Sequence, residues 1–277
     1  SRLYVVGTPI GNLGDITYRA VKTLEEVGFI AAEDTRVSAK LLNYLNIKKP
    51  MVSYHEHSHK YAGESIIKRI LEGQSCAVIT DAGMPCISDP GEDLVRLCAQ
   101  NGVEVVVVPG PSAAISALAI SGLDTSRFGF EGFPSVAKRS RYEMFTSCAK
   151  EQRTLIFYEA PHKLIATLED MLRFFGDRKI SICRELTKVH EQVIRTTLGE
   201  AVGIYGEDNP PRGEYVLIVE GCRAQEPELS NDEALERARE LVRGGVRLTD
   251  ACKEAAKSSG LSKSEIYSAL AGEKGDD

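Results

Sequence analysis

The fold of this chain is decided by residues 76–91, CAVITDAGMPCISDPG. The first four residues are an apolar run typical of a buried strand, and Leu94 and Cys98 beyond the loop recur at helical spacing. The loop therefore lies at the carboxyl end of a strand, where open α/β sheets bind ligands. Its glycines and prolines impose an irregular backbone whose N–H and C=O groups can face a ligand, and Asp81 and Asp89 frame it.

Strand and helix patterns alternate on both sides of this loop. Apolar strands are predicted at residues 3–6, 29–32, 51–54 and 103–108, with amphipathic helices between them. The run 103–108 is the richest in β-branched residues, which favours a central strand. Such a βαβ series builds a mostly parallel sheet that helices cover on both faces.

The strand patterns come closer together in the second half of the chain. They fall at residues 154–158, 179–183, 192–195 and 215–219, with fewer helical segments between the last three. This spacing is typical of a mixed sheet. We therefore predict an α/β fold with two α/β domains.

A polar, linker-like stretch at 221–230 separates these domains from a segment without strand patterns. Three short helices are expected there, and the last should begin with Ser262 as N-cap and Glu265 at the capping-box position. The arrangement is similar to a helix-turn-helix. The predicted boundaries are 1–122 and 123–224 for the α/β domains and 230–277 for the helical module.

Composition narrows the class of protein. The chain is 43% hydrophobic and 27% charged with a formal net charge of −6, so any nucleic-acid contact must come from local basic patches. No apolar run reaches the roughly 18 residues of a membrane span, and we see no signal-peptide pattern. The seven cysteines are scattered without metal-ligand spacing, which fits a reducing, cytoplasmic setting. Alternating histidines at 55, 57 and 59 are better explained as a polar loop than as a metal site, and we expect no bound metal.

Four turns stand at the ends of predicted strands. Residues 7–15 are rich in glycine, but they match neither a dinucleotide fingerprint nor a P-loop. Residues 33–36 follow the predicted strand at 29–32, and the 80–91 loop follows the one at 76–79. Residues 109–113 end at a helix N-terminus, whose N–H groups can hold a carboxylate or a substrate oxygen.

Seven ordered motifs carry a family resemblance that covers nearly the whole chain. They are Pro9 in its glycine-rich loop, AEDTR at 32–36, DAGMP…SDPG at 81–91, PGPSA at 109–113, FYEAPH at 157–162, RELTK at 184–188 and GEYVL at 213–217. In this order they resemble the ribosomal RNA small-subunit methyltransferase I family, a branch of the tetrapyrrole methylases. Tetrapyrrole methylases usually carry Gly-Asp-Pro in the third loop, where this chain has Gly83-Met84-Pro85, and this departure favours the RNA branch.

The resemblance implies a reaction, a cofactor and partners. The reaction would be S-adenosylmethionine-dependent 2′-O-methylation of a cytidine in the decoding region of 16S ribosomal RNA, in the 30S subunit. The fold would be two α/β domains of the tetrapyrrole methylase type with the cofactor in the cleft between them, plus the small C-terminal helical module. A homodimer is implied, with no membrane and no DNA as partner.

Methyl transfer from a sulfonium is an in-line displacement, so the donor needs positioning more than activation. Together with the strand-end positions, the resemblance predicts cofactor contacts at ten residues: Pro9, Asp81, Gly83, Met84, Pro85, Ile87, Ser112, Ala113, Ala160 and Glu214. Asp81 could equally cap its own loop. A ribose hydroxyl is a poor nucleophile, so a general base or a polarising partner would help. Glu33, Asp34 and Glu159 are the candidates, and His162 and Glu185 also lie near predicted strand ends.

RNA phosphate is expected to meet Arg36 and a basic loop that contains Lys138, Arg139 and Arg141. Arg36 could instead form a structural ion pair with Glu33 or Asp34, and the basic loop could be a solvated surface. Two other functions stay open. One is methylation of a tetrapyrrole of the precorrin type, and the other is a non-catalytic role in ribosome assembly.

Overall fold

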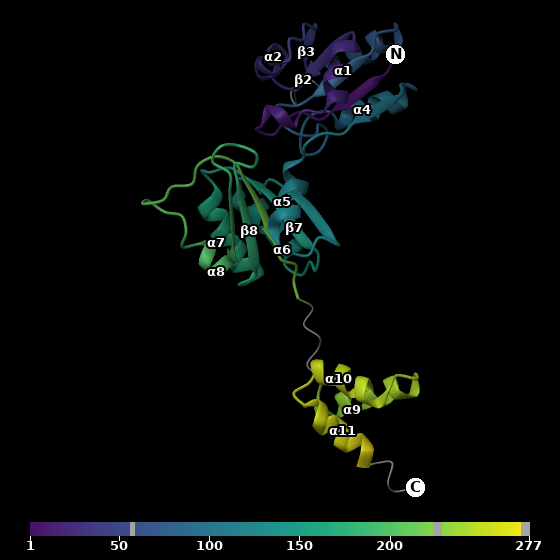
Figure 1. The fold of residues 1–277 in the computed structure, drawn as a ribbon, viewed down its shortest axis with the longest axis vertical. Coiled ribbons are helices and arrows are strands. Elements are labelled where there is room, and N and C mark those ends of the chain that lie inside the picture. The colour runs from purple at the N-terminus through teal and green to yellow at the C-terminus, as the bar shows by residue number, and fades with distance from the viewer. Residues whose placement is uncertain (56–58, 224–228, 273–277) are drawn as a thin grey trace. The chain divides into compact units, whose positions relative to one another are not determined.

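The computed structural model describes residues 1–55, 59–223 and 229–272. The chain divides into two compact units, Ser1–Cys222 and Arg223–Asp277 (Figure 1). The first unit contains two five-stranded sheets, and the second is helical.

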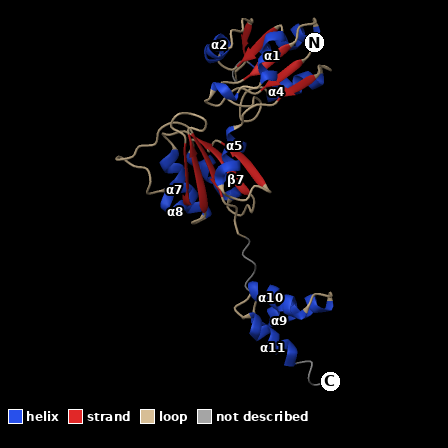
Figure 2. Ribbon diagram, in the orientation of Figure 1, coloured by secondary structure: helices blue, strands red, loops and turns tan. Residues whose placement is uncertain are grey.

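The first sheet has the strand order β3-β2-β4-β1-β5, and every pair in it is parallel. Its strands are β1 (Leu3–Val6), β2 (Phe29–Ala32), β3 (Met51–Ser53), β4 (Cys76–Ile79) and β5 (Val105–Val108). The helices between them are α1 (Tyr18–Glu26), α2 (Thr35–Tyr44), α3 (His59–Leu71) and α4 (Glu92–Gln100), and a short 3₁₀ turn, η1 (Leu13–Asp15), precedes α1. Figure 2 shows helices flanking the strands of this sheet. The parallel sheet predicted from the alternating pattern is confirmed.

Both faces of this sheet are covered because its strands alternate side chains between two cores. On one face Leu3 and Val78 pack against Ile66 of α3 and Leu94 of α4. On the other face Val6, Ile30 and Ile79 pack against Leu24 of α1 and Leu42 of α2. The central strand β4 is buried along its whole length, which places the loop that follows it over the middle of the sheet.

The prediction that 103–108 forms a central strand is wrong. The strand β5 covers Val105–Val108 and lies at the edge of the sheet, and Val107 is 54% exposed. Val105 packs against one core of the sheet and Val108 lies in the other, so an edge strand between two cores also needs apolar residues.

The second sheet has the order β6-β7-β10-β8-β9, and only its β6–β7 pair is parallel. Its strands are β6 (Phe128–Gly132), β7 (Thr154–Glu159), β8 (Lys179–Arg184), β9 (Gln192–Thr197) and β10 (Tyr215–Val219). Its helices are α5 (Ala113–Ser121), α6 (Lys138–Cys148), α7 (Leu164–Phe175) and α8 (Leu198–Ala201). The predicted mixed sheet is confirmed.

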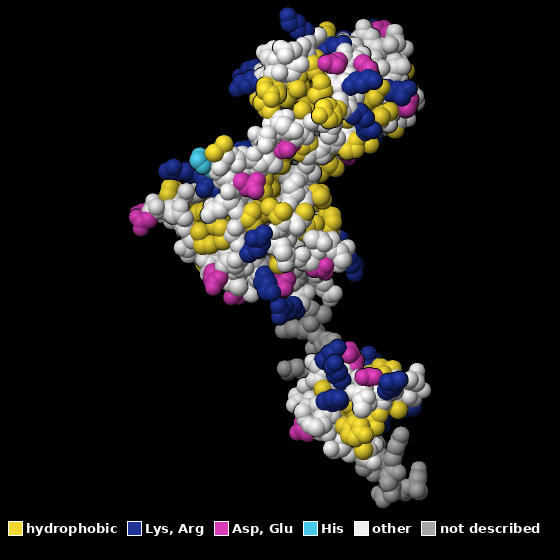
Figure 3. Space-filling view, in the orientation of Figure 1, with side chains coloured by type: hydrophobic (Ala, Val, Ile, Leu, Met, Phe, Trp, Pro, Cys, Tyr) yellow, Lys and Arg dark blue, Asp and Glu magenta, His cyan; other side chains and the backbone are white. Residues whose placement is uncertain are grey.

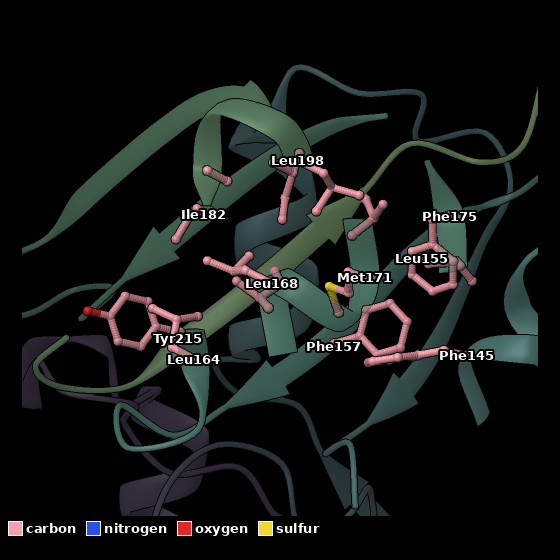
Figure 4. Close-up of a cluster of buried hydrophobic side chains, with 14 of the residues drawn as sticks. Phe145, Leu155, Phe157, Leu164, Leu168, Met171, Phe175, Ile182, Leu198 and Tyr215 are labelled. Carbon is pink, nitrogen blue, oxygen red and sulfur yellow. The ribbon is translucent and has the colours of Figure 1, made fainter. Parts of the chain in front are cut away.

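Two cores cover this sheet as well. On one face, α6, α7 and α8 bury Phe145, Met171 and Leu198 against strand residues such as Phe157 and Ile182 (Figure 4). On the other face, the small side chains of α5 pack against β7, β8 and β10. The helix α5 thus follows a strand of the first sheet but packs on the second. The domain boundary after residue 122 stays a prediction.

The second unit contains α9 (Asn231–Arg243), α10 (Leu248–Lys257) and α11 (Lys263–Gly272) around a small core. The Ser262–Glu265 capping box is confirmed, because the Glu265 carboxylate accepts the Ser262 N–H at 2.7 Å and the Glu265 N–H donates to Ser262 Oγ at 3.3 Å. A second capping box, Ser230–Glu233, begins α9.

Candidate functional site

Three of the four predicted turns meet at the carboxyl ends of β1, β4 and β5. The backbones of Thr8 and Gly83 exchange two hydrogen bonds, of 2.8 and 3.1 Å, which ties the first loop to the third. A Cβ on Gly7 would lie 2.6 Å from Gly110 Cα and 2.7 Å from Met84 Sδ. Glycine is therefore required where the first, third and fourth loops touch.

The fourth loop presents a helix N-terminus to this site. Ser112 is the N-cap of α5 but makes no side-chain capping hydrogen bond, so its hydroxyl does not satisfy the first-turn amides. The Ala114 N–H donates to the Tyr158 hydroxyl at 3.1 Å, which connects this helix to the end of β7.

The second sheet contributes a bridge of charged groups. The Lys188 ammonium lies 2.9 Å from a Glu185 carboxylate oxygen and 2.8 Å from a Glu214 carboxylate oxygen. Burial acts to raise the pKa of Glu185, but the Lys188 hydrogen bond and the Glu214 N–H outweigh it and lower that pKa. A Cβ on Gly11 would lie 2.5 Å from Lys188 Cγ, so the first loop touches this bridge.

A cavity of about 520 Å³ lies where these loops meet. The residues that line it are Ile10, Asp15, Thr17, Pro109, Gly110, Pro111, Ser116 and Thr187. The Thr187 Oγ1 atom is buried and has no hydrogen-bond partner among the described residues. None of the ten residues predicted to contact the cofactor lines this cavity, although Pro9 and Ser112 are chain neighbours of residues that do.

The ten predicted residues differ in their exposure. Pro9, Gly83 and Pro85 are buried in the joined loops. Met84, Ser112, Ala113 and Ala160 are partly buried, whereas Asp81, Ile87 and Glu214 are exposed. Pro9, Gly83, Met84, Ser112 and Ala113 belong to the loops that touch one another, and Glu214 belongs to the charged bridge.

Carboxylates gather beside these loops at the ends of β2 and β4. The Asp81 N–H donates to Glu33 Oε2 and the Asp34 N–H donates to Asp81 Oδ1, both at 3.3 Å. Burial raises the pKa of Glu33 and that of Asp81. Arg36 donates to both oxygens of Asp34, and this hydrogen bonding lowers the pKa of Asp34 to about 2. The structural pairing of Arg36 with Asp34 is thus present, and the Arg36 side chain is still 88% exposed.

Asp89 completes this group of carboxylates. Burial raises its pKa to about 7, and the charges of Glu33 and Asp81 add to the increase. Its loop is strained, because the non-glycine residues Cys86 and Ser88 have φ angles of +71° and +56°. The sequence places Asp89 in the correct loop, but its proximity to Glu33 depends on the parallel pairing of β2 with β4.

Glu159 differs from the other candidate bases because it is enclosed. Its side chain is 0% exposed and lies 3.0 Å from the Lys163 ammonium. It also accepts the Thr167 hydroxyl at 2.5 Å and the Ala160 N–H at 2.8 Å. These contacts hold the turn after β7, and they leave Glu33, Asp34, Asp81 and Asp89 as the carboxylates closer to solvent.

The basic loop predicted at 138–141 is wrong as a description of the backbone, because these residues form the first turn of α6. No side chain caps this helix, so the usual start signal is missing from the sequence. Arg139 is 91% exposed and pairs with Glu143 at 3.0 Å. Arg141 is 13% exposed and pairs with Asp170 of α7 at 2.8 Å.

Replacing Arg141 with methionine is expected to lower the free energy of unfolding by about 3–5 kcal/mol. The reason is that the nearly buried Asp170 carboxylate would lose its cationic partner. Arg139→Met should change it by less than about 1 kcal/mol, since the exposed pair with Glu143 contributes little. Urea unfolding of both variants measures the difference. Equal stability of the two variants would contradict this assignment of Arg141 to the fold.

Within residues 1–55, 59–223 and 229–272, no group of three or more His, Cys, Asp or Glu side chains could hold a metal ion. His57 lies outside the described residues. No helix in the part of the chain that the structure describes is long and apolar enough to cross a membrane.

Comparisons with known proteins agree with this architecture. Residues 2–202 match the family of tetrapyrrole (corrin/porphyrin) methylases. The chain is 44% identical to ribosomal RNA small subunit methyltransferase I of Synechocystis sp. over 96% of this chain and 95% of that protein. It is 45% identical to the protein of the same name from Halalkalibacterium halodurans, over 96% and 93% of the two chains. For the one from Escherichia coli O157:H7 the identity is 42%, with the same coverage.

Solved structures share the fold at low identity. A diphthine synthase superposes with a TM-score of 0.60 at 14% identity, over 79% of this chain and 90% of that one. The uroporphyrin-III-C-methyltransferase of Thermus thermophilus gives a TM-score of 0.56 at 18% identity, over 79% and 94%.

Proposed function

Because this chain belongs to the ribosomal RNA small-subunit methyltransferase I family of tetrapyrrole methylases, we propose that it methylates the 2′ hydroxyl of cytidine 1402 in 16S ribosomal RNA. The observation that supports this most directly is the contact of the loops after β1, β4 and β5 beside a group of carboxylates. Such a site can position a methyl donor and accept a proton.

S-adenosylmethionine, when bound, would supply the methyl group. The described residues suit it in two ways. Gly7 and Gly110 let the first and fourth loops touch backbone to backbone, which brings their backbone groups together at the site. The Ser112 side chain does not cap α5, and of the first-turn amides Ala114 N–H donates to the Tyr158 hydroxyl. The carboxylates of Glu33, Asp34 and Asp81 give the site a negative potential, which favours a sulfonium cation.

The proton of the ribose hydroxyl needs an acceptor, and we assign this role to Asp89. A general base works best when its pKa lies near the operating pH. The pKa of Asp89 is raised to about 7, whereas that of Asp34 is lowered to about 2, which makes Asp34 a weak base. Glu33, whose charge acts on Asp89 and whose own pKa is raised by burial, is the second choice.

The remaining parts of the proposal concern partners and location. The substrate would be the 30S subunit in the cytoplasm, and the active form would be a homodimer. Methylation of isolated 30S subunits by the purified chain, mapped at single-nucleotide resolution, tests the reaction. Modification at any other nucleotide, or none, would exclude this function.

Two other functions would give different results when the chain is incubated with 30S subunits. A precorrin-type methylase would transfer the methyl group to a tetrapyrrole and leave 30S subunits unmodified. An assembly factor would bind 30S subunits without binding S-adenosylmethionine. The 42–45% identity to curated rRNA methyltransferases over 96% of the chain favours the RNA reaction over both.

Removing residues 223–277 is expected to leave S-adenosylmethionine affinity unchanged and to weaken 30S binding by about tenfold. The reason is that these residues form a compact unit with its own core. Calorimetry with the cofactor and filter binding with 30S subunits measure the two effects. A truncated chain that loses the cofactor would show that the helical unit belongs to the catalytic site.

A further inference from the structure

A hollow of about 770 Å³ lies over α6, and none of the loop residues described above lines it. Its volume falls within the roughly 300–1,000 Å³ of ligand pockets. The residues that line it are Lys138, Arg139, Tyr142, Glu143, Thr146, Ser147 and Phe174. We call it the α6 hollow.

Aromatic rings and cations alternate in the α6 hollow. The rings of Tyr142 and Phe174 meet edge to face with centroids 4.8 Å apart. The Lys138 ammonium lies 5.3 Å from the centre of the Tyr142 ring. The Arg173 guanidinium is also 5.3 Å from this centre, and it donates to the Tyr142 hydroxyl at 3.2 Å. Two rings are thus held in place with positive charge beside them.

The α6 hollow carries more basic than acidic side chains, whereas the chain as a whole is acidic. The chain carries a net charge of −6, and on the face drawn in Figure 3 basic side chains are scattered among acidic ones. At the hollow, Lys138, Arg139 and Arg173 are exposed, and Glu143 is the one carboxylate among its lining residues. A stacking surface with cations at its rim complements the bases and phosphates of a single strand.

Aromatic contacts lead from the candidate site toward the start of α6. The Tyr158 hydroxyl accepts an amide of α5, and the Tyr158 ring lies 5.3 Å from the ring of Phe133. Phe133 is 55% exposed and precedes Lys138 by one short segment of chain. The Lys163 ammonium spans this segment, since it donates to the Pro134 carbonyl at 3.3 Å and lies 5.8 Å from the Phe133 ring centre.

We propose that the α6 hollow binds a single-stranded segment of RNA, with one base stacked on the Tyr142 ring beside Phe174 and the neighbouring phosphates paired with Lys138, Arg139 and Arg173. This inference rests on the proposed function, because it takes RNA as the substrate. It adds a second region of RNA contact outside the carboxylate-lined site. In this region an unpaired strand would be bound by base stacking and by charge.

The chain has no tryptophan, so a single substitution creates a specific fluorescent probe. Tyr142→Trp keeps an aromatic ring in the hollow, and the oligonucleotide rC10 should quench its emission on stacking. Phe128→Trp is the matched control, because Phe128 is 38% exposed and begins β6, at the other end of that strand from the segment leading to α6. Its emission should not respond to rC10.

Tyr142→Leu keeps apolar volume but removes the stacking surface, and it should weaken rC10 binding about tenfold. Its S-adenosylmethionine affinity should equal that of the wild type, which shows that the fold is intact. Unchanged emission of Tyr142→Trp at saturating rC10, or rC10 binding by Tyr142→Leu within twofold of the wild type, would overturn the proposal. Emission that responds to 30S proteins and not to rC10 would also overturn it and assign the hollow to a protein partner.

Methylation of 30S subunits by the wild-type chain separates this inference from the proposed function. If the wild type methylates 30S subunits while rC10 leaves the emission of Tyr142→Trp unchanged, only the α6 hollow proposal fails. If rC10 quenches that emission, Tyr142→Leu weakens binding and no methylation occurs, the hollow is an RNA site and the proposed reaction fails.

Discussion

Replacing Asp89 with asparagine is expected to lower the rate of 30S methylation by roughly 10²–10⁴-fold, the usual contribution of a positioned general base. The wild-type rate should rise with pH and level off above about 7, because Asp89 accepts a proton only after it ionises and its pKa is raised to about 7. The variant should lack this pH dependence. Initial rates between pH 5 and 9 measure both effects.

Asp208→Asn is the control, since it removes one exposed carboxylate of the same type. A stability measurement gives an independent check of the Asp89 pKa. Because folding raises the pKa of this acid, Asp89 contributes a loss of stability as the pH rises from about 4 to about 7, and this contribution should be absent from Asp89→Asn. A variant with wild-type rate and pH profile would remove Asp89 as the base and direct attention to Glu33.

Gly110→Ala is expected to reduce S-adenosylmethionine affinity at least a hundredfold. The added Cβ would lie 2.8 Å from Gly7 Cα and 2.9 Å from Gly7 O, so two backbones must separate and the joined loops must shift. Overpacking of this kind also costs about 1–3 kcal/mol of stability. Calorimetry with the cofactor and urea unfolding measure the two losses.

The control for this substitution is Gly206→Ala, whose Cβ would have no atom within 4 Å. It should bind the cofactor like the wild type. Wild-type affinity in Gly110→Ala would mean that the contact of the first and fourth loops does not shape the cofactor site. Loss of affinity in both variants would point to a general effect of the glycine changes rather than to this contact.

Local sequence signals predicted much of the fold. The loop after β4 and the Ser262–Glu265 capping box were predictable because each depends on residues that are close in the chain. The position of β5 was not, because face coverage gives an edge strand the same composition as a central one. The start of α6 was also missed, since Ala137 offers no side-chain cap.

The candidate site depended more on tertiary structure. Its loops could be predicted from strand ends, but the properties of single residues could not. The pKa of Asp89 depends on burial and on Glu33, which is far away in sequence and is brought near by the pairing of β2 with β4. The burial of Glu159 and the pairing of Arg141 with Asp170 likewise appear only once helices pack on the second sheet.

The packing of α5 has a mechanical consequence. The chain leaves the first sheet at Val108 and enters a helix that packs on the second sheet at Ala113, so residues 109–112 are the covalent pivot between the two sheets. A ligand that contacts this pivot stiffens it and thereby restrains rotation of one sheet against the other. An acceptor RNA that favours one angle between the sheets therefore changes the affinity of the chain for the methyl donor. By linkage, the donor must change the affinity for that RNA by the same factor.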